Sequence, residues 1–153
     1  MDPLTQAADT IIEQSVEAAL PAVESMALRR IDDTRVATTR CVFETERDTV
    51  IKVPHRENLI DINEREAKAW KNCQDETLIA PVVDYHDEYR WIEMKRCRRF
   101  HPTKSRDRSY KSFTDKLANS DWQIGDVHMD NIGILPANNE IVSYDYPDME
   151  RVS

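Results

Sequence analysis

The sequence predicts an α+β fold, in which helices and a small antiparallel sheet share one domain. Three observations indicate it. The first 30 residues have the apolar spacing of a helix, the strand-like stretches that follow pair into hairpins, and two further helical stretches separate those hairpins. At 153 residues the chain has the length of a single domain with a modest core.

Residues 1–30 are predicted to form an amphipathic helical segment. Asp2 can cap its start, and Pro3 suits the first helical position. Pro21 is expected to kink or restart the helix, which would then continue to about Arg30. The apolar positions fall near one stripe, which we expect to pack against the rest of the domain: Leu4, Ala8, Ile11, Ile12, Val16, Ala19 and Val23.

Residues 31–95 are predicted to hold a compact set of strands and one helix. Runs 35–43 and 49–53 read as two strands that turn at ETERD, and 77–85 with 89–96 form a second hairpin. Between them, RENLIDINEREAKAWKNC has helical composition, with Ile62, Ala69 and Trp70 as its expected buried positions.

Residues 96–153 are predicted to form a small second part of the domain. A helix over RSYKSFTDKLANS ends near Asn119, the loop GDVHMDN follows, and IGILP and EIVSYDY form a hairpin through ANN. The only two glycines of the chain, Gly125 and Gly133, flank this loop. We therefore expect the backbone here to turn sharply or to approach another group closely.

Composition excludes several classes of partner. The net charge of −8 opposes non-specific binding to nucleic acid or an anionic membrane, and no aromatic ladder indicates a nucleic-acid partner. No window is apolar enough to span a bilayer, and no basic-then-apolar leader begins the chain. Three separated cysteines without a C-x-x-C pair predict reduced thiols and a cytoplasmic location.

A basic run, KRCRRFHPTKSRDR, interrupts this acidic background. A solvated linker is its simplest interpretation. The alternative is a cradle for a phosphorylated or polyanionic acceptor, since arginine forks bind phosphate bidentately.

The loop GDVHMDN concentrates chemically active side chains. As a metal site, Gly-Asp-x-His superficially resembles part of a metallophosphoesterase, but such an enzyme needs further ligands from several loops. The other histidines, His55, His86 and His101, stand in unrelated polar surroundings. This interpretation is therefore the less favoured one, and an ordinary polar turn remains open beside it.

Phosphoryl transfer accounts for more of the sequence. That chemistry needs an aspartate at the acceptor hydroxyl, an Asn and a second Asp for Mg²⁺, and a lysine fixed by a helix glutamate. The chain supplies each of these residue types. In sequence order they are Lys52 in TVIKVP, Glu66 on the next helix, Asp126, Asn131, and Asp145 after the last hairpin.

In these motifs the chain resembles the protein-kinase-like fold, particularly its aminoglycoside-phosphotransferase branch and small archaeal or viral kinase-like proteins. GDVHMDN matches the Gly-Asp-x-His-x-x-Asn catalytic loop position by position, VIKV resembles the lysine strand, and SYDYP stands where that family has a second metal-binding aspartate. The resemblance covers about residues 35–147. It implies a helical segment at 1–30, a small-sheet N-lobe at 31–95 and a much reduced C-lobe at 96–153.

The resemblance also implies ATP and Mg²⁺ as cofactors and a role for each site residue. Asp126 would be the catalytic base and His128 would support its loop. Asn131 and Asp145 would bind Mg²⁺. The remaining implied residues contact the nucleotide, Lys52 and Glu66 as an ion pair and the second hairpin through its backbone: Glu93, Met94 and Lys95.

The chain also departs from the family. RVATTRCVFETERD contains no glycine, so the usual phosphate-covering loop is absent, and Ile124 replaces the histidine before Gly125. Only eight residues follow Asp145, where the family has the activation segment and helices that bind its acceptor. We therefore expect, besides the nucleotide, an unusually small acceptor or a protein partner. A non-catalytic kinase-like module and a polar interaction domain therefore remain alternatives to the enzyme.

The ion pair gives the sharpest expectation. A lysine in the nucleotide strand would point into the cleft and need a partner, and Glu66 is preferred over Glu64 because it shares a stripe with Ile62 and Trp70. The simpler alternatives are a solvent-facing Lys52 and two glutamates on a solvated helix face.

Overall fold

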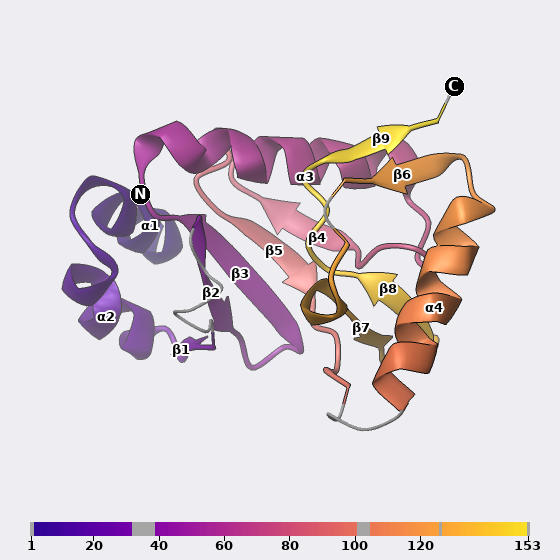
Figure 1. Cartoon of the computed structure of the whole chain (residues 1–153). Helices are drawn as coiled ribbons and strands as arrows, with labels where there is room; N and C mark the ends of the chain where they lie inside the picture. Colours follow the sequence, from indigo (N-terminus) through magenta and orange to yellow (C-terminus); the bar gives the residue numbers. More distant parts are fainter. Residues whose placement is uncertain (1, 32–38, 101–104, 126, 153) are drawn as a thin grey trace.

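A computed structural model describes residues 2–31, 39–100, 105–125 and 127–152, and its architecture is α+β. A five-stranded antiparallel sheet lies at the centre, in the strand order β1-β2-β3-β5-β4 (Figure 1). Its strands are Arg29–Arg30 (β1), Arg40–Glu44 (β2), Thr49–Pro54 (β3), Val82–Tyr85 (β4) and Ile92–Lys95 (β5). Two separate two-stranded sheets complete the described part of the chain.

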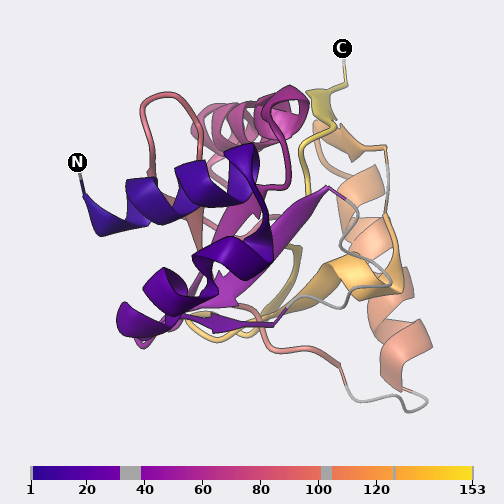
Figure 2. The ribbon, with the colours of Figure 1, turned by 90° about the vertical axis from the view of Figure 1, so that its left-hand side faces the viewer.

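Two helices, α1 (Pro3–Glu13) and α2 (Val16–Ser25), cover one face of this sheet, the face turned toward the viewer in Figure 2. The predicted kink at Pro21 is wrong, since the break falls at Gln14–Ser15 and Pro21 lies inside α2. The Ser15 hydroxyl accepts the Ala18 N–H at 3.1 Å and so begins a new helix at that point. The predicted stripe is buried except for Leu4, which is half-buried.

The segment after α2 also departs from the prediction. The helix does not reach Arg30, because Ala27 takes a left-handed conformation (φ 56°) and the chain then enters β1. Strands β2 and β3 form the expected hairpin, which places Val42 opposite Lys52. The turn uses Asp48 at φ 58°, a conformation that aspartate tolerates better than most residues, so no glycine is needed.

Strand β3 is buried on both faces. Ile51 and Val53 pack against α1 and α2, whereas Val50 belongs to the second core cluster on the other face. That second face is covered by α3 (Ile60–Cys73), which follows the short helical turn η1 (Glu57–Leu59), and by the C-terminal part of the chain. Alternation along β3 therefore directs Lys52 toward α3 and the C-terminal segments.

The C-terminal part consists of one helix and two small sheets. Its elements are α4 (Ser105–Ala118), β6 (Trp122–Ile124), η2 (Met129–Asn131), β7 (Ile132–Leu135), β8 (Glu140–Ser143) and β9 (Met149–Arg151). The predicted β7–β8 hairpin is confirmed, but the β6–β9 pair has no counterpart in the prediction. Single bridges from Ile79 to Ser143 and from Arg98 to Ile134 join β7–β8 to the first part of the molecule.

Gly133 shows why glycine is placed at this junction. A Cβ at this position would lie 2.7 Å from the Arg98 carbonyl oxygen, closer than real Cβ atoms approach. Close approach between two backbones, rather than a turn, is therefore what requires glycine here.

Some predicted features fall on residues outside the described ranges: the catalytic-base candidate Asp126, residues 101–104 of the basic run with His101, and positions 35–38 of the first predicted strand. Among the helices that are described, none combines the length and the apolarity needed to cross a membrane.

Candidate functional site

The centre of the site is a buried ion pair between strand β3 and helix α3. Lys52 Nζ donates to Glu66 Oε1 at 2.9 Å, and Lys52 also donates to the backbone carbonyl of Tyr144. The residues are only 4% and 0% exposed. The expected contact and the choice of Glu66 are therefore confirmed, whereas Glu64 pairs with Lys68 on the surface at 3.1 Å.

The helix face that presents Glu66 differs from the predicted one. Asn63, Glu66 and Ala67 are buried, whereas Ile62 and Trp70 are only partly buried, so of the predicted set Ala69 alone is fully buried. The buried face of α3 thus includes two polar side chains, Asn63 and Glu66, which apolar spacing could not predict. Burial of Asn63 is compensated by hydrogen bonds, since its side-chain amide donates to the carbonyl oxygens of Lys52 and Tyr89.

Arg40 is the member of the site that sequence reasoning missed. It enters from β2, on the same face as Lys52, and is 5% exposed. Its Nη1 lies 2.8 Å from Glu66 Oε1 and 3.1 Å from Asn63 Oδ1, and its Nη2 lies 2.9 Å from Asp145 Oδ1. One guanidinium thus joins the helix glutamate to the C-terminal aspartate.

The two predicted metal ligands lie at one end of the β7–β8 hairpin. Asn131 and Tyr144 face each other there, and the Tyr144 N–H donates to the Asn131 carbonyl at 3.0 Å. Asp145 follows directly, with its side chain 40% exposed. The adjacent Tyr146 N–H donates to Glu66 Oε2 at 2.7 Å, so this segment is anchored to the buried ion pair.

The loop between β6 and β7 is held at several points. The Asn131 N–H donates to the His128 carbonyl at 2.9 Å, and the Tyr110 hydroxyl of α4 donates to the Val127 carbonyl at 3.2 Å. The Tyr144 hydroxyl donates to the Asp130 carbonyl. The position of Asp126 relative to Asp145 lies outside what the structure describes.

The predicted nucleotide-edge residues have a different environment from the ion pair. Glu93 and Met94 lie in β5 between two paired strands, and the Lys95 N–H donates to the Pro81 carbonyl at 2.9 Å. The Glu93 carboxylate accepts from the Thr49 hydroxyl at 2.5 Å and from Arg47 at 3.0 Å. Their hydrogen bonding is thus largely internal, because β5 is a central rather than an edge strand.

Burial and neighbouring charges shift the pKa values of Glu66, Lys52 and Arg40. Burial would raise the pKa of Glu66, but the Arg40 and Lys52 charges outweigh it and lower the pKa to about 2. Burial lowers the pKa of Lys52, and Arg40 adds to that effect while Glu66 opposes it. For Arg40, Glu66 and Asp145 overcome burial and raise the pKa. The carboxylate of Glu66 is accordingly charged at neutral pH.

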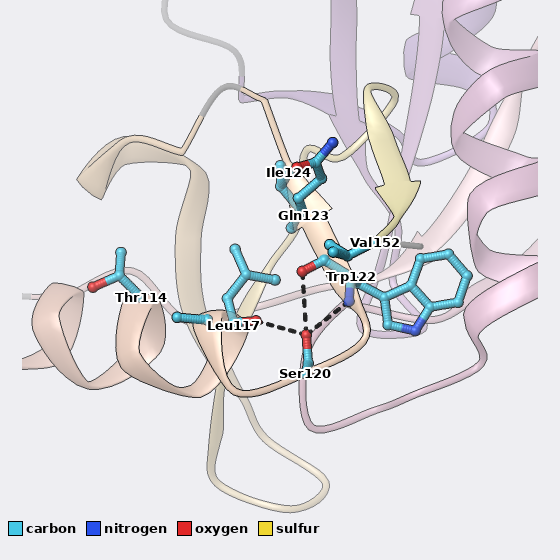
Figure 3. A pocket seen from close by; sticks show the side chains of 8 residues that line it. Thr114, Leu117, Ser120, Trp122, Gln123, Ile124 and Val152 are labelled. Carbon is cyan, nitrogen blue, oxygen red and sulfur yellow. Dashed lines mark hydrogen bonds between the residues drawn. The ribbon is translucent and has the colours of Figure 1, made fainter.

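Two surface pockets of the described residues lie away from the ion pair. One of about 270 Å³ is formed by α4, β6 and Val152 (Figure 3). Its Ser120 hydroxyl already bonds the Leu117 carbonyl at 2.7 Å and the Trp122 N–H at 3.1 Å, so it offers little to a ligand. Another, of about 520 Å³, lies between the outer face of α3 and β9, and neither pocket includes Lys52, Glu66 or Asp145.

Two other predicted features can be placed. In the basic run, Arg96 pairs with Glu44 at 2.7 Å and Arg98 pairs through its backbone with Ile134, while 101–104 lie outside the described ranges. Across the described ranges, no three His, Cys, Asp or Glu side chains are grouped so as to hold a metal ion.

Comparison with models of known protein families finds no match to this chain, and comparison with curated proteins finds no significant relative.

Proposed function

We propose that this chain is a kinase-like protein that binds ATP with Mg²⁺ and transfers phosphate to an acceptor. The observation that carries the proposal is the buried pair between Lys52 on β3 and Glu66 on α3. A lysine on the third strand, held by a glutamate of the following helix, is the arrangement with which protein kinases position nucleotide phosphates.

Burial of this pair supports a functional role. Removing an ammonium and a carboxylate from water costs more free energy than burying two apolar side chains of similar volume. A buried ion pair is therefore weak evidence of a role in stability alone. Lys52 also lies beside the segment that carries Asp145, since it donates to the Tyr144 carbonyl. A positive charge is thus held next to a half-exposed carboxylate, as binding of a metal-bound polyphosphate would require.

The chemistry of Asn131 and Asp145 fits the expected metal. Mg²⁺ prefers oxygen ligands, and in nucleotide sites it takes one or two carboxylates while phosphates and water complete the octahedron. When bound, the metal would neutralise charge on the phosphate oxygens. Asn131 and Asp145 would hold it from the end of the hairpin, Lys52 would hold the phosphates, and Asp126 would accept the acceptor's proton.

A non-catalytic nucleotide-binding module is the second candidate, and the Arg40–Asp145 contact favours it. Arg40 neutralises the carboxylate on which metal binding would depend, with 2.9 Å between Nη2 and Oδ1. In an enzyme that contact must open during the reaction cycle. In a binding module it can persist.

Calorimetry with ATP, with and without Mg²⁺, tests nucleotide binding directly. Lys52→Met should weaken Mg·ATP binding at least about tenfold, because it removes the cation nearest the phosphates. Lys68→Met is the matched control, since it removes a lysine from the outer surface of α3, where it pairs with Glu64. Asp145→Asn, at a half-exposed position, should weaken the Mg²⁺-dependent part of the affinity and leave the fold intact.

Chromatographic detection of ADP separates the two candidates. Asp126→Asn should abolish ADP formation and leave ATP affinity nearly unchanged, because the base acts on the acceptor rather than on the nucleotide. Binding without turnover by the wild-type chain would favour the module. No binding by the wild-type chain, or equal affinities for Lys52→Met and Lys68→Met, would refute the kinase-like proposal.

A further inference from the structure

Arg40 begins β2, the strand that precedes the lysine strand β3, in a stretch of sequence without a glycine-rich phosphate-binding loop. Glycine-rich loops bind phosphate through backbone N–H groups that only a glycine backbone brings close enough. Between positions 35 and 48 the sequence has no glycine. Instead, the strand that precedes β3 directs the Arg40 side chain onto the face that carries Lys52.

The Arg40 guanidinium is oriented by its buried contacts. Nη1 is fixed by Glu66 and Asn63 at 2.8 and 3.1 Å. Nη2 makes its short contact with Asp145, and its distance to Glu66 Oε2 is longer, 3.5 Å. Because Asp145 is the half-exposed member of the group, the Nη2 edge is the part of the guanidinium directed toward the solvent-accessible side.

The four charged side chains at the site have no net charge while Asp145 is paired with Arg40. Arg40 and Lys52 contribute two positive charges, and Glu66 and Asp145 contribute two negative ones. If Asp145 binds a metal ion instead, Arg40 loses one of its two carboxylate partners while remaining buried. Glu66 would then be the single carboxylate shared by two buried cations, Arg40 and Lys52. Because a surplus buried charge is disfavoured, an anion in the place of Asp145 would restore the balance.

We propose that Arg40 is a phosphate-binding residue, whose Nη2 edge exchanges the Asp145 carboxylate for a phosphate oxygen of the bound nucleotide. This inference rests on the nucleotide-binding function proposed above. The planar guanidinium suits such an exchange, because it binds carboxylate and phosphate with the same fork of donors and stays protonated in both states. Glu66 and Asn63 keep the guanidinium in place while its other partner changes.

Affinities for ATP, ADP and AMP test the inference, measured by calorimetry in the presence of Mg²⁺. In the wild-type chain, affinity should rise with the number of phosphates. Arg40→Gln should lower the ratio of ATP to AMP affinity by about tenfold or more and leave the AMP affinity nearly unchanged. Arg40→Lys should lower the ratio less, since it keeps the charge but loses the fork. Arg65→Gln, on the outer face of α3, should leave the ratio unchanged.

The outcomes separate the inference from the function on which it rests. A wild-type chain that binds no nucleotide refutes both. A wild-type chain that binds ATP, with an unchanged or increased ATP-to-AMP ratio in Arg40→Gln, overturns the role of Arg40 alone and makes it a structural partner of Asp145. If circular dichroism shows that Arg40→Gln does not fold, Arg40→Lys decides, because a fall in its ratio supports phosphate binding and an unchanged ratio opposes it.

Discussion

Replacing Glu66 by Gln removes one negative charge from the centre of the molecule while nearly preserving the side-chain volume. Three donors converge on the carboxylate: Arg40 Nη1 at 2.8 Å, Lys52 Nζ at 2.9 Å and the Tyr146 N–H at 2.7 Å. A glutamine has one acceptor oxygen, and its –NH₂ is a donor. At least one of the three donors would therefore face another donor, and two buried cations would lose their shared carboxylate.

The expected loss of stability is about 3–5 kcal/mol, the usual cost of removing one partner of a buried ion pair. That is a large fraction of the roughly 5–15 kcal/mol by which small domains are stable. Glu64→Gln is the matched control two residues away. Its i,i+4 contact with Lys68 is at the surface, so its loss should cost under about 0.5 kcal/mol.

Urea unfolding at pH 7, followed by far-ultraviolet circular dichroism, gives the free energy of unfolding of each variant. The dependence of that free energy on urea should stay similar in all three proteins if the same surface is exposed on unfolding. Point mutations typically lower the free energy of unfolding by roughly 1 kcal/mol. If the losses for Glu66→Gln and Glu64→Gln differ by less than about that amount, the view that a buried charge network holds α3 to the sheet is refuted.

Acidification and two further substitutions also test the structure. Because the pKa of Glu66 is about 2 against an ordinary 4.5, its stabilisation is fully present above pH 4.5 and is lost as the pH falls toward 2. Urea titrations over this range should show roughly 3 kcal/mol of pH-dependent stability that Glu66→Gln lacks. Gly133→Ala should cost about 1–3 kcal/mol in urea unfolding, because its Cβ would meet the Arg98 carbonyl, and an unchanged midpoint would show that the two backbones can separate freely. Tyr146→Phe removes the hydroxyl that donates to the buried Ala80 carbonyl at 2.5 Å and should cost about 1–3 kcal/mol, visible as a lower thermal midpoint; equal midpoints would mean that another donor replaces it.

The sequence predicted the site best where the position of a residue allowed a single physical explanation. A lysine in an apolar strand needs a partner, and the next helix offered Glu64 or Glu66. The contact with Glu66 follows the prediction, although the helix face was inferred from Ile62 and Trp70, which are only partly buried. Apolar spacing misplaced that face because α3 buries two polar side chains, Asn63 and Glu66, both of which bond to Arg40 on the sheet.

Arg40 was missed for a related reason. In an irregular strand, an arginine is ordinarily a solvent-facing residue, and nothing local to residue 40 distinguishes it. The hairpin register would have revealed it, since a turn over ETERD sets Val42 opposite Lys52 and so puts Arg40 on the same face. Its second partner, Asp145, is 105 residues away and no local pattern links the two.

The remaining errors concern short-range choices. Pro21 was expected to interrupt the first helix, but the Ser15 cap sets the break instead, and α2 continues through the exposed proline. The β6–β9 pair was missed because each strand has only three residues, too few for an alternating pattern to be recognised.

The wide spacing of the site residues along the chain has a consequence for folding. Lys52 and Glu66 are 14 residues apart and can meet as soon as the β2–β3 hairpin and α3 come together. Until residue 145 docks, Arg40 and Lys52 share the single carboxylate of Glu66, so the early structure carries a surplus positive charge. That surplus attracts the C-terminal segment, whose contact with Arg40 spans 105 residues. Because distant contacts form late, we expect capture of Asp145 to be among the last steps of folding, and slowed by high salt.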